Sequence, residues 1–373
     1  MTLRKVLSIV FIFLCTVSGR VNARTTTQTS KAGANYAQPP SGAENTHCIF
    51  GDHRGCIFTV IVVDARGRST QIHCPIHRMV VLNEDSLEVI RILHAQELVV
   101  GVDNRIAGRP LFWPVLRNGP TVGKWNEPSY EKIATLQPDI VLCYGNRPGL
   151  ELEKKLNPLG IQVLRLDFYK MLTMPGEIKT LGMLLNRKKE AEIFLRWYRK
   201  KLDLVEELVK KDPHQPRIYL ESYSNYHALG PGSGGYEMGL LAGGQNIASN
   251  LSITYPEVTP EWVLTRNPDV IIKTVSSMSA YRFGNTEKLR KVRDRIIHRQ
   301  GWSNMRAVKT GKVYVMESDI CAGPSAIVGI AYMAKWFHPE QCSGLNPEEI
   351  HRQYLEQFQG LAYRGIYVYP NEH

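Results

Sequence analysis

The chain has 373 residues, of which 43% are hydrophobic and 22% are charged. This length allows two domains. The hydrophobic and charged fractions are those of an ordinary globular protein, whose core needs no disulfide bonds for stability. The formal net charge of +11 suits an anionic ligand or an anionic surface, and it serves solubility equally well. Because the chain has neither a basic run nor a recognition motif, nucleic acid is not an expected partner.

The first 23 residues predict a secretory signal peptide. Arg4 and Lys5 precede an apolar run that is too short to span a bilayer, and the residues ending at Ala23 offer a cleavage site. Cys15 follows bulky residues where a lipoprotein signal has small ones, so cleavage near Ala23 is favoured over lipidation. An uncleaved N-terminal anchor is the alternative. In either case we expect an exported protein, in the periplasm or at the cell surface.

The next part of the chain predicts a linker followed by an α/β lobe. Residues 24–46 are rich in Thr, Ser, Gly, Pro and Ala, which is typical of a linker. The stretch 57–75, "IFTVIVVDARGRSTQIHCP", predicts a β-hairpin with its turn at 65–67. From 78 to 167 strands and helices alternate with short connections, which indicates parallel strands covered by helices. We assign residues 47–172 to an N-terminal α/β lobe.

A long helix separates this lobe from a second one. Residues 187–211 contain neither Gly nor Pro and predict one helix within a connecting segment, 173–213. The alternation of strands and helices then resumes, and residues 214–373 are assigned to a C-terminal α/β lobe with a helical tail. The predicted fold class is therefore α/β: two Rossmann-like lobes with mainly parallel sheets, joined by a single long α-helix.

Six cysteines follow the signal peptide, and an exported chain can oxidise them. They are Cys48, Cys56, Cys74, Cys143, Cys321 and Cys342. Cys48 and Cys56 flank a turn-like stretch, which favours a local disulfide, and a bridge between Cys321 and Cys342 is a weaker hypothesis. Cys143 lies in an apolar strand and predicts a buried thiol. The full pairing stays open, and the absence of a CxxC pair leaves a zinc ribbon or a thioredoxin-type site unsupported.

One local pattern occurs twice, in "YEKIATLQPDIVL" (130–142) and "PEWVLTRNPDVII" (260–272). In each copy a glutamate, Glu131 or Glu261, stands seven residues before the proline at which a short helix ends and a buried strand follows. A carboxylate in the first turn complements the helix dipole, and this role alone would account for each glutamate. The matched spacing favours a second interpretation, in which two pseudo-symmetric lobes each present one carboxylate on a common side.

Several further stretches occur in a recognisable order. They are "VVDARGRSTQI", "RMVVLNEDSLEVIRILHAQELVVGVD", "VGKWNEPSYEKIATLQPDIVL", "YEMGLLAGGQNIA" and "YPEVTPEWVLTRNPDVII". Together they resemble the substrate-binding proteins of ABC importers for iron–siderophore complexes, haem and cobalamin, from about residue 58 onward. The resemblance implies a monomer that delivers its ligand to a permease dimer. It also implies that Glu131 and Glu261 dock into arginine pockets on that permease.

Candidate ligand-binding residues follow from the strand order. Ligands of open α/β sheets bind beyond the carboxyl ends of the strands, and two lobes would bring those ends together across a cleft. Trp125 is added because the family commonly places a ligand-contacting aromatic there. The candidates are Asn83, Glu84, Trp125, Tyr144, Asn146, Arg147, Tyr223, Tyr226, His227, Ser233 and Lys273.

These residue types suit an anionic metal chelate, such as an iron(III) siderophore, haem or a cobalamin-like complex. Arg147 and Lys273 would supply charge, and the aromatic residues would supply flat amphipathic surface. A Tyr or His could also ligate iron directly, but no metal ligand is assigned. Tyr223 and Tyr226 could equally serve packing, and His227 could be a hydrogen-bonded surface residue. No resident cofactor is expected.

Sequence motifs of other functional classes bear on this hypothesis. "GPGSGG" (230–235) matches GxGxxG, but a loop separates it from the preceding strand and an exported chain lies away from nicotinamide pools. Its N–H groups could still meet an anion, or it could be a tight turn only. No HExxH, GxSxG or P-loop motif is present, so we expect no enzyme. A molybdate or tungstate binder, a chelatase-like enzyme and an adhesive surface protein are the alternatives.

Overall fold

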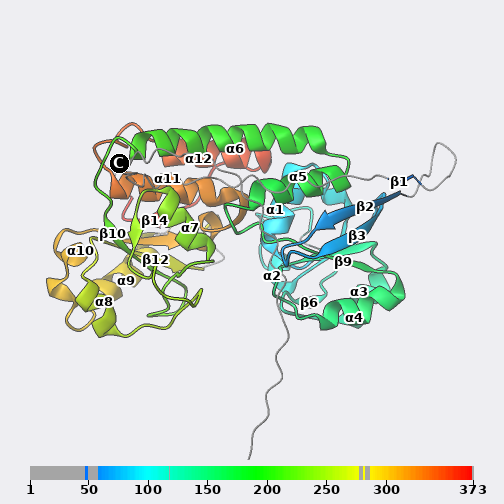
Figure 1. Cartoon of the computed structure of the whole chain (residues 1–373), viewed down its shortest axis with the longest axis horizontal. Coiled ribbons are helices and arrows are strands. Elements are labelled where there is room, and N and C mark those ends of the chain that lie inside the picture. Colours follow the sequence, from blue (N-terminus) through cyan, green and yellow to red (C-terminus); the bar gives the residue numbers. More distant parts are fainter. Residues whose placement is uncertain (1–46, 49–57, 117, 277–279, 282–285, 372–373) are drawn as a thin grey trace, which may run out of the picture. The chain divides into compact units, whose positions relative to one another are not determined.

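The computed structural model describes residues 47–48, 58–116, 118–276, 280–281 and 286–371. Two β-sheets form the frame of this part of the chain. The first sheet is parallel throughout, with the order β5 (Val99–Val102), β4 (Met79–Val81), β8 (Ile140–Cys143) and β9 (Gln162–Arg165). The second has the order β11 (Gln245–Asn246), β10 (Arg217–Glu221), β12 (Val270–Val275), β13 (Val313–Glu317) and β14 (Val368–Tyr369), and only β14 is antiparallel. We call each sheet with its covering helices a lobe, N-terminal and C-terminal (Figure 1).

The central strands are buried on both faces. Every residue of β8 is buried, as are the first five residues of β12. Runs of Val, Ile and Leu are expected in parallel strands that carry helices on both sides. The predicted α/β class with parallel sheets is therefore confirmed.

The helices of the N-terminal lobe begin where the sequence supplies capping residues. Asn83 caps α1, and its side chain accepts the backbone N–H of Ser86 at 2.8 Å. The helices are α1 (Glu84–Ile92), α2 (Asn104–Ala107), α3 (Tyr130–Leu136) and α4 (Glu151–Leu156). The predicted hairpin is formed by β2 (Phe58–Val63) and β3 (Ser69–Cys74), and the remaining strands are β1 (His47–Cys48), β6 (Gly123–Lys124) and β7 (Glu127–Pro128).

The C-terminal lobe carries six α-helices among its described residues. They are α7 (Gly234–Leu241), α8 (Pro260–Arg266), α9 (Thr286–Ile297), α10 (Arg306–Lys309), α11 (Ala326–Phe337) and α12 (Pro347–Gln353). A short π-helix, η6 (Tyr354–Phe358), continues α12. The helical tail therefore forms as predicted, although its last turns widen from α to π geometry.

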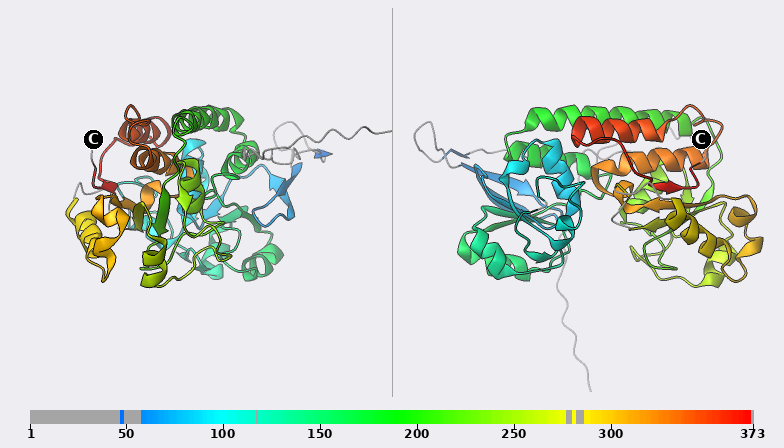
Figure 2. Two further views of the ribbon diagram at one scale, coloured as in Figure 1. Left: turned by 60° about the vertical axis from the view of Figure 1, so that its left-hand side comes forward. Right: turned by 180° about the vertical axis from the view of Figure 1, so that it is seen from behind.

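Two helices, and not one, make up the predicted connecting segment. α5 (Met174–Leu184) ends just before Asn186, whose φ of 55° breaks the helix, and α6 (Lys188–Val209) follows. The predicted helix at 187–211 therefore exists with 22 residues, but a single long connecting helix is not confirmed. α6 buries one face at the helical spacing of Ala191, Phe194, Tyr198, Leu202 and Val205. It lies beside α11 and α12 (Figure 2).

The cysteine predictions had mixed outcomes. Cys143 is a buried free thiol, as predicted, and Cys74 is also free. The hypothesis of a Cys321–Cys342 bridge is wrong, because both thiols are free. These two residues lie before and after α11, whose 12 residues span about 18 Å, whereas a disulfide needs Cα atoms within about 7 Å. The predicted local bridge between residues 48 and 56 lies outside the described side chains.

Candidate ligand-binding groove

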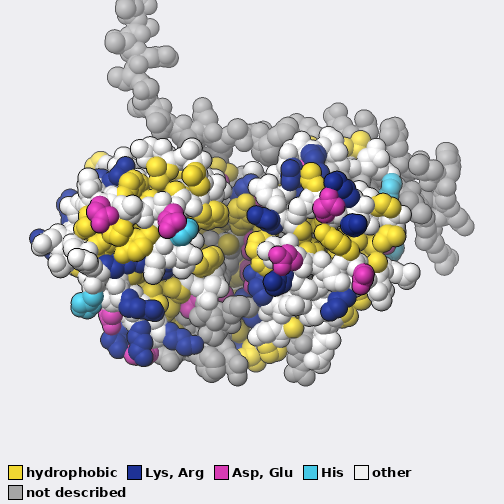
Figure 3. Space-filling view, turned by 90° about the horizontal axis from the view of Figure 1, so that it is seen from below, with side chains coloured by type: hydrophobic (Ala, Val, Ile, Leu, Met, Phe, Trp, Pro, Cys, Tyr) yellow, Lys and Arg dark blue, Asp and Glu magenta, His cyan; other side chains and the backbone are white. Residues whose placement is uncertain are grey.

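A groove separates the two lobes on the side of the molecule opposite α6. Figure 3 views the molecule from this side, and hydrophobic side chains border the groove on both lobes. The loops that follow β4, β8 and β9 supply the N-terminal wall, and the loops around β10 supply the C-terminal wall. This is the edge at which ligands of parallel α/β sheets bind.

Aromatic rings and one carboxylate form the N-terminal wall. The hydroxyl of Tyr144 donates to Asp85 Oδ2 at 2.8 Å. The ring of Tyr144 meets Trp125 edge-on at 5.7 Å between centroids, and meets Tyr169 at 5.5 Å. These contacts fix three rings in one continuous amphipathic surface. Burial raises the pKa of Asp85 to about 6, although the hydrogen bond from Tyr144 favours the ionised form.

A second carboxylate organises the loop after β9. Asp167 accepts the backbone N–H of Gly145 at 2.8 Å through Oδ1 and pairs with Lys170 Nζ at 2.8 Å through Oδ2. The Lys170 ammonium also lies 5.6 Å from the centroid of the Tyr169 ring. The charge of Lys170 is therefore balanced within its own lobe.

The C-terminal wall presents two tyrosines that face the carboxylates of the other lobe. Tyr223 is 59% exposed and Tyr255 is 50% exposed, which is high for large aromatic residues. Desolvation, followed by the charges of Asp85 and Asp167, raises the pKa of Tyr255. These charges belong to the N-terminal lobe and act on Tyr255 across the groove.

A buried arginine ties the two lobes together at the base of the groove. Arg109 pairs with Asp319 Oδ2 of the C-terminal lobe at 2.6 Å and also with Glu84 of α1. The Trp113 indole N–H donates to the same Glu84 carboxylate at 2.9 Å. Burial raises the pKa of Asp319 to about 6 against the opposing effect of Arg109. Glu84 and Asp319 are thus joined through one guanidinium, which fixes the spacing of the lobes at this point.

Several predicted site residues have structural roles in the lobes. Asn83 is buried as the cap of α1, and the Ser233 hydroxyl caps α7 while donating to Gly230 O at 2.8 Å. Lys273 is 4% exposed and contacts Glu221 at 2.9 Å and three backbone carbonyls at 2.6 to 3.2 Å. The interpretation of Lys273 as a charge offered to the ligand is therefore corrected, because its ammonium is fully engaged inside the lobe.

The remaining predicted residues differ in their exposure. The ring of Tyr226 packs edge-on against Trp302 at 6.1 Å, with Arg299 over its face at 4.4 Å. The His227 ring bonds to Asn225 O at 3.1 Å. Asn146 and Arg147 are exposed beyond the end of β8. The structure thus joins Trp125 and Tyr144 in one wall, places Tyr223 in the other, and keeps Tyr226 in its own lobe.

Sequence reasoning missed three residues of the groove: Asp167, Tyr169 and Tyr255. Asp85 belongs to the strand end 83–85 that the sequence indicates, and Asp167 and Tyr169 follow β9 and obey the same strand-end rule that selected Tyr144. Tyr255 lies in the irregular segment between β11 and α8, where no periodic pattern indicates direction. Only the tertiary arrangement brings this loop to the groove.

The two repeated stretches fold alike. Ser129 caps α3 and Thr259 caps α8, each accepting a backbone N–H three residues further on, at 3.3 and 3.1 Å. Both helices end at a residue in the left-handed region, Gln137 with φ 46° and Asn267 with φ 40°. The repetition in the sequence is therefore a repetition of local structure.

The strands that follow are anchored in the same way, and both glutamates are exposed. Asp139 accepts the N–H of the residue before β4, and Asp269 accepts that of the first residue of β10, both at 2.8 Å. Glu131 and Glu261 lie in the first turns of α3 and α8. These helices lie on the side of the two lobes away from α6 (Figure 1).

The geometry agrees with a comparison against known proteins. A family model described as "Periplasmic binding protein" matches residues 79–320. The chain belongs to this family. The cobalamin-binding protein of Halobacterium salinarum is 26% identical over 320 residues, covering 84% of this chain and 81% of that protein. The molybdate-binding protein MolA of Haemophilus influenzae is 24% identical over 341 residues, covering 82% and 92%.

Solved structures share the fold of this periplasmic binding protein. The TroA-like periplasmic binding protein FepB of Veillonella parvula superposes with a TM-score of 0.67 at 22% identity, covering 83% of this chain and 98% of that one. The predicted resemblance to substrate-binding proteins of ABC transporters is confirmed. In the described part of this periplasmic binding protein, no helix is long and apolar enough to cross a membrane. Within the same residues, no three His, Cys, Asp or Glu side chains are placed to hold a metal ion.

Proposed function

We propose that this periplasmic binding protein captures a bulky metal chelate between its lobes and delivers it to an ABC permease. The observation that carries the proposal is the aromatic lining of both walls: Trp125, Tyr144 and Tyr169 on one, Tyr223 and Tyr255 on the other. Wide aromatic surfaces suit the flat or lipophilic face of a haem, a cobalamin-like complex or an iron(III) siderophore. The name of the Halobacterium relative, a cobalamin-binding protein, supports this ligand class.

A small oxyanion is the second candidate, because MolA is a molybdate-binding protein of similar sequence. A molybdate-sized anion needs a compact set of free donors. Here Lys170 is paired with Asp167, the Lys273 ammonium is engaged by Glu221, and the Ser233 hydroxyl is used as a helix cap. These contacts favour the chelate.

The two exposed glutamates are proposed as the contacts with the permease. Glu131 and Glu261 are presented by helices with the same caps, the same C-terminal geometry and the same orientation relative to the lobes. Arginine pockets on two equivalent permease subunits would bind such carboxylates through charge-assisted hydrogen bonds. We propose a monomeric, non-enzymatic protein that works outside the cytoplasm, exported by its N-terminal signal and free of a resident cofactor.

Ligand titration tests the proposed ligand class. Cyanocobalamin, haemin, a ferric hydroxamate siderophore and molybdate are each titrated into the full chain, with binding measured by calorimetry. One of the three chelates should bind with micromolar or tighter affinity, and Tyr223→Ala should weaken it by about tenfold or more. Tyr223→Phe keeps the ring and is the matched control, which should bind nearly as well as the parent. Binding of molybdate alone would reject the chelate in favour of the oxyanion.

A further inference from the structure

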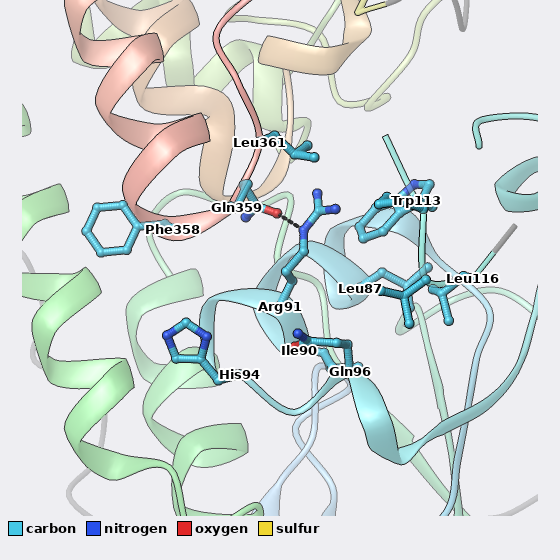
Figure 4. Close-up of a pocket in the computed structure, with 13 residues that line it drawn as sticks. Leu87, Ile90, Arg91, His94, Gln96, Trp113, Leu116, Phe358, Gln359 and Leu361 are labelled. Carbon is cyan, nitrogen blue, oxygen red and sulfur yellow. Dashed lines mark hydrogen bonds between the residues drawn. The ribbon is translucent and has the colours of Figure 1, made fainter. Parts of the chain in front are cut away.

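A second pocket lies away from the groove, around the C-terminal half of α1. Its volume is about 210 Å³, and Figure 4 shows the side chains that line it. Leu87 and Ile90 of α1, Trp113 and Leu116 of the following loop, and the segment 358–361 after η6 supply its mainly apolar walls. A buried cavity of about 150 Å³ is enough to hold benzene, so this pocket can hold a molecule of about that size with one extra group.

One cation faces this pocket, the guanidinium of Arg91. Its Nε donates to Gln359 Oε1 at 2.5 Å, and its Nη1 donates to Phe112 O at 2.5 Å. Its plane lies over the Trp113 ring at 4.1 Å from the centroid. Nη2 is buried and has no hydrogen-bond partner. The guanidinium is therefore held rigidly from two sides and has one donor group to spare.

Within the described part of the chain no carboxylate forms an ion pair with Arg91, although the charges of Glu88 and Glu84 act on it from further away. Glu88, one turn earlier on α1, is the nearest acidic residue in sequence. Its carboxyl is instead bonded to the Tyr354 hydroxyl, and burial raises the pKa of Glu88 well above its ordinary value. Burial lowers the pKa of Arg91 to about 10 even though Glu88 and Glu84 oppose this effect, so an anion that meets Nη2 would be favoured.

A second polar atom in the pocket lacks a partner. Gln96 lines the wall near Ile90, and its Oε1 is buried without a hydrogen bond. The amide of Gln96 and the guanidinium of Arg91 are thus the two polar groups with unused bonding capacity in a pocket whose other walls are apolar. Gln96 Oε1 is an acceptor and cannot be partnered by a carboxylate, so Arg91 Nη2 is the unpartnered donor of the two that an anion would satisfy.

We infer that this pocket is a binding site for a small carboxylate with an apolar body, whose carboxylate meets Arg91 Nη2 and whose body packs between Trp113, Leu116 and Leu361. A carboxylate matches the donor geometry of a guanidinium better than other small anions of this size. The site is separate from the groove, and the inference does not rest on the proposed function. α1 joins the two places, since its N-terminal turn carries Glu84 and Asp85 at the groove.

The test compares 4-fluorobenzoate with the neutral isostere 4-fluorobenzamide by ligand-observed fluorine NMR on the full chain. Compounds of this size bind in the millimolar range, so each is followed up to about 10 mM. The benzoate should bind about tenfold or more tightly than the benzamide, because only the benzoate forms a charge-assisted hydrogen bond. Equal affinity of the two compounds, or no binding of the benzoate, would overturn the inference.

Two variants locate the binding. Arg91→Met should abolish the preference for the benzoate. Val115→Asp is the second variant, because Arg91→Met also removes a buried contact. Val115 is 70% exposed at the rim of the pocket, so its replacement by Asp should retain the fold while adding a negative charge that repels the carboxylate of the benzoate. Val115→Asp should weaken the binding of the benzoate several-fold, whereas Val115→Asn and the groove variant Tyr223→Ala should leave its affinity unchanged. Unchanged benzoate affinity in Val115→Asp would place the compound elsewhere and reject the site.

Discussion

The two lobes are alike on the faces that carry α3 and α8, and they differ where they face each other across the groove. Both helices have seven residues, a hydroxyl side chain as cap and a left-handed residue at the end. The walls differ: the N-terminal wall is an array of three rings in which Tyr144 is bonded to Asp85, whereas the C-terminal wall offers the exposed rings of Tyr223 and Tyr255. A partner with two equivalent halves requires matched surfaces, and a single asymmetric ligand requires unlike ones. The comparison therefore separates the residues proposed to dock from the residues proposed to bind the ligand.

The largest effect should come from removing the matched glutamates together. Glu131→Ala with Glu261→Ala should abolish ligand transport in a reconstituted importer, because each permease half loses its charged contact. Ligand affinity, measured by calorimetry on the isolated protein, should stay unchanged, because neither residue lies in the groove.

The chain supplies a matched control for this experiment. Glu127 and Glu257 are also exposed, and each stands four residues before one of the proposed docking glutamates. Glu127→Ala with Glu257→Ala removes the same formal charge from exposed positions and should leave transport intact. Equal loss of transport in both double variants would show that net charge matters and the two specific positions do not.

The contact between the lobes should have the next largest effect. Arg109→Met leaves the buried carboxylate of Asp319 and the partly exposed carboxylate of Glu84 without their shared cation, which should cost about 3 kcal/mol of the free energy of unfolding. Lys154→Met, which breaks the exposed pair with Glu151, is the control and should change stability little. Chemical denaturation measures both, and a loss as small as the control's would contradict the role given to Arg109.

The groove carboxylate predicts a pH dependence with a definite sign. The pKa of Asp85 is about 6 in the folded state, above its ordinary value of 3.8, so the folded state holds this proton more tightly than the unfolded state. Its contribution to stability is therefore complete below about pH 4 and is lost as the pH rises to about 6. Thermal unfolding should show Asp85→Asn gaining stability relative to the parent across this range. A constant difference between the two proteins would contradict the raised pKa.

The smallest predicted effect tests the likeness of the two helices. Ser129→Ala and Thr259→Ala each remove the hydroxyl that caps α3 or α8, and each should cost about 1 kcal/mol of the free energy of unfolding. Denaturant unfolding of the two variants should give losses that agree within a few tenths of a kcal/mol. A loss in one variant only would show that the repeated sequences are not energetically equivalent.

Much of the fold follows from sequence patterns because parallel strands and amphipathic helices have distinct periods. Strand β8 is a continuous apolar run, β12 begins with one, and α6 repeats its buried residues at three- and four-residue spacing. The break at Asn186 was not predicted, because asparagine in the left-handed conformation is set by packing around it and has no periodic signal.

The candidate site was only partly predictable for a related reason. The strand-end rule places Tyr144 and Tyr223 near the groove, but it does not say where a side chain points. Lys273 lies inside β12, two residues before its end, and its side chain turns inward to Glu221, whereas Tyr255 lies in an irregular segment and is affected by the charges across the groove. Partners that are distant in sequence decide both outcomes. The pocket at Arg91 likewise depends on Gln359, which lies 268 residues away along the chain.

Native mass spectrometry of the protein purified from its source tests the central claim most directly. We expect the full chain to carry a single metal chelate of the haem, cobalamin or siderophore class, and a variant with Tyr223→Ala and Tyr255→Ala to be recovered without it. A parent protein that carries only molybdate, or a double variant that retains the chelate at full occupancy, would contradict binding between the two aromatic walls.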